Sequence, residues 1–405
     1  MPITDLQLQS LARDATQRLT AGDFAGAEPL LAQAVAARPN SGQALHLLGQ
    51  ARLKLGRFAE AREPLERAAK FLPKEVAAQI NYAGCLAVLG EHEASLWALD
   101  RAAKLKPDDP AIAHNKGRAF DALGRVGEAE RAYDDALAVD HRLMPSLIAR
   151  AGLLEARGDW MGALADLDMA LVNRPDDARL RLRRGELLLQ QGDWMRGLPD
   201  YEARLEIPGE RYAPDLPRWQ GEPLDGRLLI YPEQLDIESD GAKRDTLMLA
   251  RGVDAVVQCG ETIGALLDGP TARRGDPLDG FVAAAPLRSL PYLLNWSPDT
   301  PPPPPPLRHL PEAGTTVGWF SRREPPPGLE VERDLDRIAS CKLVVGDDIY
   351  PTHLAARLGL STIVLLPSRA DWLWGSHPTR SAWYPDVVFA PEGNSSALAA
   401  HLTKP

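Results

Sequence analysis

The chain has 405 residues, of which 44% are hydrophobic and 25% charged, and this length and composition predict a soluble protein of two or three globular domains. Its formal net charge is -10 and its pI is near 5.4, so it lacks the basic surface that binding to a phosphate backbone requires. We therefore expect no nucleic-acid partner.

The N-terminal stretch MPITDLQLQSLARDATQRL has neither the basic region nor the apolar run of a signal peptide. No apolar stretch of the sequence reaches the ~20 residues of a spanning helix. We expect no membrane insertion and a cytoplasmic location. Cys85, Cys259 and Cys341 are too widely spaced for a disulfide framework or a metal knuckle, and we expect three small buried residues and no metal site.

The first half of the chain repeats a pattern every 34 residues. Each unit has a Gly, a small residue five positions later, a large apolar residue four further on, and a Pro eight after that. The pattern starts at Gly22, Gly56, Gly90, Gly124 and Gly158, with His141 in place of Pro in the fourth unit, and a sixth unit keeps Gly192, Gly197 and Tyr201. The Gly would end one helix, the small residue would let the next helix approach it, and the Pro would stop that helix.

This register resembles the tetratricopeptide repeat. The resemblance implies helical hairpins that stack into a superhelical α solenoid over residues 1–205, with about six repeats and a concave groove that binds a protein or peptide. Asn81 and Asn115 share one repeat position and resemble two rungs of the asparagine ladder that holds peptide backbone in O-linked N-acetylglucosamine transferases. The other units have Arg13, Leu47, Ala149 and Arg183 there. The alternative is that both asparagines are solvated or bond to the backbone of a neighbouring helix. A homo-oligomer also remains open.

After the last repeat, the junction GDWMRGLPDYEARLEIPGERYAPDLPRWQGEPLDGRLLIYPEQ runs into a predicted strand, Leu228 to Tyr231. The junction resembles a bacterial family that fuses tetratricopeptide repeats to a glycosyltransferase-like domain of the GT-B type, related to O-linked N-acetylglucosamine transferases and heptosyltransferases. The residues that match are Trp194, Gly197, Tyr201, Glu202, Arg204, Pro217, Trp219, Gly221, Glu222, Glu233 and Gln234.

The second half alternates strand-like and helix-like stretches, which predict a parallel α/β fold. The resemblance implies two reduced Rossmann-like lobes of a GT-B domain: a first lobe at 206–297 and a shortened second lobe at 313–405. Between them, at 298–312, six consecutive prolines would form a stiff linker of ~19 Å at ~3.1 Å per residue. The closing segment matches the family through Asp371, Trp372, Trp374, Trp383, Tyr384 and Pro385. The three tryptophans would form a sugar or base platform or, alternatively, pack under a C-terminal helix, Ser395 to Leu402.

The clearest β/α unit is CKLVVGDDIYPTHLAARLGLSTIVLLP. It predicts a buried strand, a helix that opens near Pro351 and stops at Gly359, and a second buried strand. Asp348, His353, Leu354 and Ala355 match the family's turn, and Ile349 replaces its hydroxyl residue. The resemblance implies that the N-terminus of this helix receives the diphosphate of a nucleotide-sugar, with Asp348, Thr352, His353 and Arg322 as binding residues. For His353 the alternatives are a catalytic role and a buried histidine whose ring is satisfied.

Asp245 matches the base that the family places after its Gly-x-Gly turn. Here LDIESDGAKR replaces the glycines, and its carboxylates Asp236, Glu238 and Asp240 would repel a diphosphate. The alternative is an exposed acidic loop with Asp245 as a helix N-terminal carboxylate.

Two hypotheses follow. The one we favour is a protein-interaction adaptor with a degenerate glycosyltransferase-like domain. The alternative is an active protein O-glycosyltransferase with Asp245 and His353 as catalytic residues, which would need no cofactor and would use a nucleotide-diphosphate sugar as its substrate.

Overall fold

The computed structural model describes residues 5–209, 211–250, 254–296, 316–322, 331–366 and 387–391, with Pro325, Ser381 and Tyr384. The chain divides into two compact units, Met1–Pro175 and Asp176–Pro405. The expected proline-rich linker at 298–312, the three tryptophans Trp372, Trp374 and Trp383, and the expected C-terminal helix lie outside the described residues. No helix in the described part of the chain is long and apolar enough to cross a membrane.

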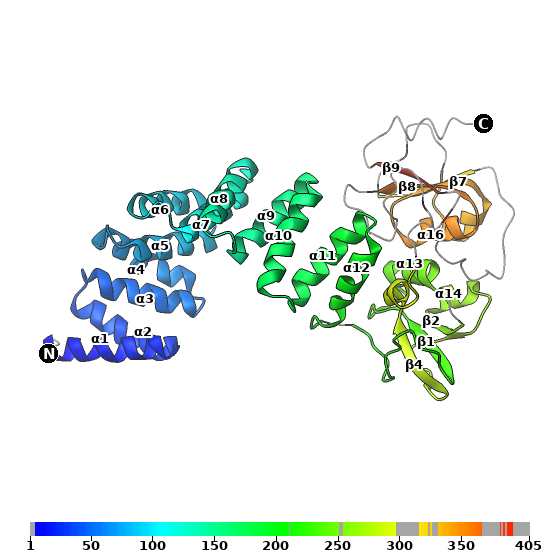
Figure 1. The fold of residues 1–405 in the computed structure, drawn as a ribbon, viewed down its shortest axis with the longest axis horizontal. Helices are drawn as coiled ribbons and strands as arrows, with labels where there is room; N and C mark the ends of the chain where they lie inside the picture. The colour runs from blue at the N-terminus through cyan, green and yellow to red at the C-terminus, as the bar shows by residue number, and fades with distance from the viewer. Residues whose placement is uncertain are drawn as a thin grey trace. The chain divides into compact units, whose positions relative to one another are not determined.

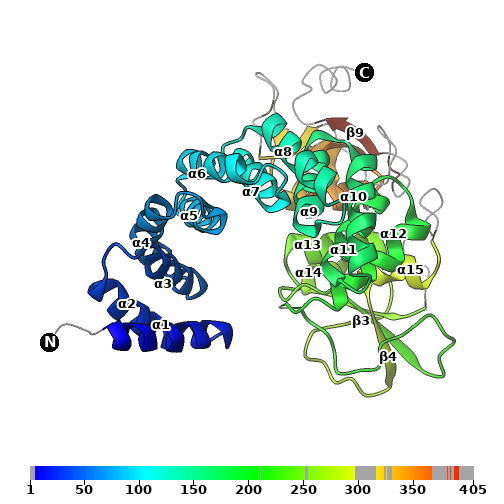
Figure 2. The ribbon, with the colours of Figure 1, turned by 60° about the vertical axis from the view of Figure 1, so that its left-hand side comes forward.

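The described part of the first unit consists of ten α-helices that form five hairpins, which follow one another in a stack (Figure 2). The helices are α1 (Asp5–Thr20), α2 (Phe24–Ala37), α3 (Gly42–Lys54), α4 (Phe58–Phe71), α5 (Val76–Val88), α6 (His92–Leu105), α7 (Pro110–Ala122), α8 (Val126–Val139), α9 (Met144–Arg157) and α10 (Trp160–Asn173). Each helix packs most closely on its hairpin partner and then on the next hairpin. The N-terminal part of the chain is therefore an α solenoid, as predicted, and these are five of the six or so repeats expected over residues 1–205.

Two kinds of glycine explain the hairpin geometry. The turn glycine Gly56 has a φ of 74°, a left-handed conformation that glycine adopts without steric cost. The second kind lies inside a helix at a close approach. A Cβ atom on Gly117 of α7 would lie 2.5 Å from Cε1 of Tyr133 on α8, so only glycine lets this tyrosine pack against the helix.

The second unit begins with one more hairpin and continues into two parallel sheets (Figure 1). The hairpin is α11 (Ala178–Gln190) and α12 (Trp194–Tyr201), followed by a short 3-10 helix, Glu202–Leu205. The first sheet has the order β3-β2-β1-β4, with β1 (Arg227–Tyr231), β2 (Val256–Gln258), β3 (Thr271–Ala272) and β4 (Phe281–Pro286). Its helices are α13 (Asp240–Leu249), α14 (Glu261–Leu266) and α15 (Leu290–Leu293).

The second sheet has the order β6-β5-β7-β8-β9. Its strands are β5 (Thr316–Phe320), β6 (Val331–Glu332), β7 (Cys341–Gly346), β8 (Ser361–Leu366) and β9 (Val387–Pro391), and α16 (Tyr350–Arg357) connects β7 to β8. Every strand pair in both sheets is parallel, as the alternating pattern predicted.

Helix α13 lies between the two sheets and contacts α16. Its Met248 belongs to a buried cluster that also contains Trp194 of the last hairpin and Val364 of β8. Its neighbour Leu247 belongs to a second buried cluster, with Val344 of β7 and Leu354 of α16. The last hairpin and both sheets therefore contribute side chains to a common apolar core, and burial of these side chains stabilises their association.

The three cysteines are free and buried, as expected.

Candidate functional site

The candidate base Asp245 lies in the middle of α13 and is 1% exposed. Arg288, which follows β4, holds its carboxylate with two bonds, from Nε to Oδ2 at 2.8 Å and from Nη2 to Oδ1 at 3.1 Å. Gln234, which follows β1, donates to Oδ2 at 2.8 Å, and Arg244 donates from Nη2 to Oδ1 at 3.1 Å. Asp245 therefore joins the carboxyl ends of two neighbouring strands to the helix.

The charge of Asp245 is stabilised by these partners. Burial alone would raise the pKa of this carboxyl group, but Arg288, Arg244 and Gln234 lower it to about 2. The alternative that made Asp245 a helix N-terminal carboxylate beside an exposed acidic loop is wrong about Asp245, which lies in the middle of the helix, although Asp236 and Asp240 before it are exposed. The helix starts earlier, at Asp240, because the Ser239 hydroxyl accepts from the Ala242 amide and caps it.

Arg244 connects this cluster to the second sheet. Its Nη1 atom lies 3.2 Å from Oδ2 of Asp348, which follows β7 in the turn before α16. The other oxygen of Asp348 accepts from Nε2 of His353 at 2.9 Å. The structure thus brings Asp245, Asp348 and His353, three predicted site residues from both halves of the α/β unit, into one network.

His353 is completely buried in α16. Burial lowers the pKa of its imidazole below the ordinary value, although Asp348 opposes this effect. A neutral ring that donates from Nε2 to Asp348 has Nδ1 left as an acceptor, and the Tyr384 hydroxyl lies 3.4 Å from that atom. This is the geometry of a histidine whose ring is satisfied inside the protein.

The N-terminal turn of α16 is lined by carboxylates of the chain itself. Asp347 accepts from the Ser321 hydroxyl at 2.9 Å and from the backbone amide of Arg322 at 3.0 Å. The side chain of Arg322 is exposed. Thr352, in contrast, is fully buried, and its hydroxyl has no hydrogen-bond partner in the described structure. A phosphate at this turn would meet Asp347 and Asp348 before it reached the helix amides.

The last hairpin is tied to the same edge of the first sheet. Arg204 donates to Oε2 of Glu233, with both bonds at 3.3 Å, and to the Ser289 hydroxyl at 2.8 Å. The Tyr201 hydroxyl accepts from Nη1 of Arg288 at 2.8 Å. The carboxyl ends of parallel strands are where such sheets bind ligands, and here that edge is filled by side chains of the protein.

The two groove asparagines differ in their surroundings. The Asn81 amide bonds to Nε2 of His46, on the preceding repeat, at 2.8 Å. Asn115 is half-buried and forms no side-chain hydrogen bond to any described residue. Its neighbour His114 instead bonds to the Ser146 hydroxyl of the next repeat at 2.9 Å. The Asn81 amide therefore links two repeats, and the Asn115 amide forms no such link within the described residues.

Sequence reasoning missed Arg288 and Asp347. Arg288 lies in the segment LRSLP, where a single arginine among apolar residues gives no sign of the carboxylate that it meets. Asp347 is adjacent to the predicted residue Asp348, and the pair of acids directly after a buried strand is a signal that could have found it.

Two tetratricopeptide repeat family models match the chain, one over residues 18–75 and one over residues 148–210. A comparison with curated proteins finds no match. Similar solved structures include a thermophilic TPR protein of Thermus thermophilus, with 25% identity and a TM-score of 0.38 over 45% of this chain and 99% of that chain. A tetratricopeptide repeat protein of Parabacteroides merdae has 22% identity and a TM-score of 0.43 over 49% and 79%. The pilF protein of Pseudomonas aeruginosa has 18% identity and a TM-score of 0.45 over 50% and 93%.

The family matches and the 34-residue hairpin period agree, so the chain carries tetratricopeptide repeats, as the sequence predicted. The repeats make its N-terminal part a scaffold for protein interaction.

Proposed function

We propose that this protein is an adaptor: the tetratricopeptide repeats bind a protein or peptide, and the α/β unit is a glycosyltransferase-related domain that does not transfer sugar. In this proposal residues 206–297 and 313–405 are two reduced Rossmann-like lobes of the GT-B type. The domain serves as a structural platform that is fused to the last repeat through their common core.

The observation that carries the proposal is the state of Asp245. A general base must reach the proton that it removes and have a pKa near the working pH. Asp245 is 1% exposed, and its pKa is lowered to about 2 by contacts that include two arginines. A carboxylate held in this way is a poor proton acceptor, and no acceptor hydroxyl can approach it while Arg288 covers it.

The pairing of the charged side chains around Asp245 also supports a domain that transfers no sugar. Arg244 and Arg288 are neutralised by Asp245 and Asp348, and His353 is held neutral by burial. A nucleoside diphosphate would have to displace Asp348 from Arg244 and also come close to Asp347, so binding would break the ion pair that links the two sheets.

A thermal-shift panel tests this proposal. We expect the full chain to keep its melting temperature in UDP, GDP, ADP and CMP, because a ligand that binds the folded state at 100 times its Kd would stabilise it by about 2.7 kcal/mol. Stabilisation by one of these nucleotides that is lost in both Asp348→Asn and His353→Gln would reject the adaptor proposal. The exposed variant Asp225→Asn is the matched control.

The second candidate is an active O-glycosyltransferase that selects its protein acceptor through the repeats. What favours it is the convergence of Asp245, Asp348 and His353, together with the buried Thr352 hydroxyl that lacks a partner in the described structure. Under this hypothesis a nucleotide-sugar opens the Arg244–Asp348 pair. The panel separates the two candidates, since this enzyme must bind a nucleotide at the network and gain stability from it, whereas the adaptor proposal predicts no nucleotide binding there.

A further inference from the structure

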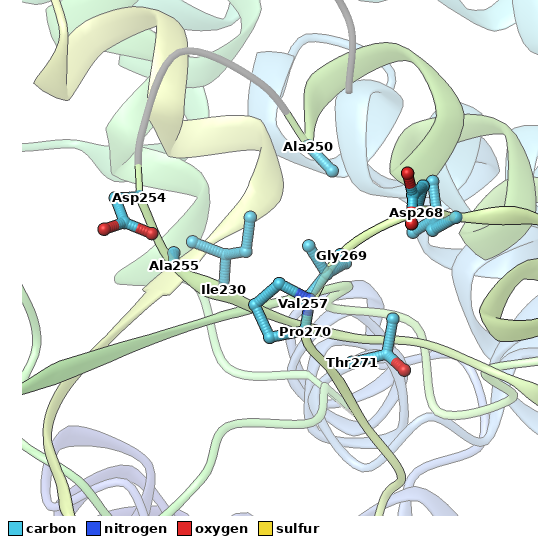
Figure 3. A pocket seen from close by; sticks show the side chains of 10 residues that line it. Ile230, Ala250, Asp254, Ala255, Val257, Asp268, Gly269, Pro270 and Thr271 are labelled. Atoms are coloured by element: carbon cyan, nitrogen blue, oxygen red, sulfur yellow. The ribbon is translucent and has the colours of Figure 1, made fainter. Parts of the chain in front are cut away.

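The first sheet has a cavity of about 160 Å³ (Figure 3). Its floor is one cross-strand row, in which Ile230 of β1 pairs with Val257 of β2 and Val257 pairs with Thr271 of β3. Helix α13 carries Asp245 of the ionic network in its middle and ends at the cavity, where Ala250 forms part of the wall. These two residues are about 7.5 Å apart along the helix axis, and none of the residues that line the cavity belongs to the network.

The walls of the cavity are mostly hydrocarbon. The floor residue Ile230 and the wall residues Ala250 and Leu267 are 1%, 3% and 2% exposed, so the space reaches into the core. Ala255 and Gly269 also line it, and their small size leaves the space open. A cavity of about 150 Å³ with aliphatic walls is large enough for a benzene ring, so this one accepts an apolar group of that size.

Two carboxylates lie on opposite sides of the cavity (Figure 3). Asp254 precedes β2 and Asp268 precedes β3, and both side chains are exposed. Neither forms a hydrogen bond or ion pair with any residue in the described part of the chain, and none of the ten lining residues is basic. The described rim therefore carries two carboxylates and no basic side chain above an apolar floor, a charge arrangement that favours cations over anions.

We propose that this cavity binds a small primary amine whose cation is attached to a compact apolar group, of which benzylammonium is the simplest aromatic example. The ring would lie over Ile230 and Val257, and the ammonium group would stay at the rim, near Asp254 or Asp268, where water still reaches it. Such a ligand needs both parts, because the apolar floor gives no preference for charge and the exposed carboxylates alone give little affinity.

Calorimetric or ligand-observed NMR titration of the full chain tests the proposal with three ligands of nearly equal size. We expect benzylammonium to bind about fivefold more tightly than benzyl alcohol, the ratio expected for an exposed ion pair, and benzoate to bind more weakly than either. The preference for the amine should shrink as salt is added, since both carboxylates are exposed.

Variants separate the cation site from the cavity. The double variant Asp254→Asn with Asp268→Asn should bind the amine and the alcohol equally well, and Asp225→Asn, another exposed acid of the same unit, should change neither affinity. Ala255→Leu should weaken both ligands, because it fills the space. Circular dichroism melts confirm that each variant is folded.

The proposal is overturned if benzylammonium and benzyl alcohol bind equally to the wild-type chain, if the double Asn variant keeps the preference for the amine, or if no ligand binds. These outcomes are independent of the nucleotide panel, because the proposed amine site shares no residue with the ionic network.

Discussion

The two units of this protein use charged side chains in different ways. In the first unit the hairpins join through alanine and leucine, and several ion pairs, such as Arg57–Glu28 and Arg157–Glu130, have a half-exposed arginine. One pair of the first unit, Arg150–Asp166, is less exposed, with side chains 24% and 5% exposed. In the second unit the pair between Arg288 and Asp245 is buried, with side chains 19% and 2% exposed. Exposed pairs contribute little, and a broken buried pair is costly. Apolar packing therefore holds both units together, and in the second unit a network of charged side chains around Asp245 is added to the apolar core.

The largest effect should follow from Asp245→Ala. This change leaves Arg288 and Arg244 without their shared buried carboxylate, so we expect the second unit to lose about 3–5 kcal/mol of unfolding free energy. Chemical denaturation of the full chain measures the loss. Asp240→Ala, an exposed acid in the first turn of the same helix, should cost less than about 1 kcal/mol. Equal losses in the two variants would show that the buried cluster does not matter.

The next effect is the pH dependence that Asp245 contributes. The pKa of its carboxyl group is lowered in the folded state from 3.8 to about 2, so its contribution is fully present above about pH 4 and is lost as the pH falls through about 2. The shift corresponds to about 2 kcal/mol. The difference in unfolding free energy between the wild type and Asp245→Asn, followed from neutral to acid pH, isolates it. A difference that stays constant down to about pH 2 would contradict the lowered pKa.

In the first unit, replacing either of two helix glycines by alanine should change stability in opposite directions. Gly117→Ala should destabilise the solenoid by about 1 kcal/mol or more, because its Cβ atom would meet the Tyr133 ring at 2.5 Å. Gly84→Ala, inside α5 with no heavy atom within 4 Å of its Cβ position, should stabilise it by up to about 1 kcal/mol. Thermal melts of both variants provide the comparison. Destabilisation of the same size by both would mean that the close approach at Gly117 is not what requires glycine there.

The smallest change in stability is expected for the two asparagines, Asn81 and Asn115. Asn115→Ala should change stability by less than about 0.5 kcal/mol, because this side chain bonds to no described residue. Asn81→Ala should cost about 1 kcal/mol, because it removes the bond to His46. If the melts show the reverse order, Asn115 is the structural residue and Asn81 the one available to a partner.

The sequence predicts a feature of this structure best when the residues that determine the feature are close together in the chain. The repeats were predictable because glycine and proline act locally and recur every 34 residues. The strand–helix–strand unit around α16 was equally local, with Pro351 in the first helical turn and Gly359 just past the end.

Two features of the site were not predicted, for different reasons. The pair between Asp245 and Arg288 joins residues 43 positions apart, and no local pattern specifies which arginine meets a given aspartate. The start of α13 did have a local signal, in Ser239 followed by Asp240, which is typical of a helix N-terminus.

The adaptor proposal requires that the ionic network of Asp245, Arg244, Arg288, Asp348 and His353 is satisfied within the protein and performs no chemistry. The most direct test is phosphorus NMR of the full chain incubated with nucleotide-sugars, which detects any nucleoside diphosphate that is released. We predict no release above the rate without protein. Release that is reduced both by Asp245→Asn and by Asp348→Asn, in variants that remain folded, would contradict the claim and establish an enzyme.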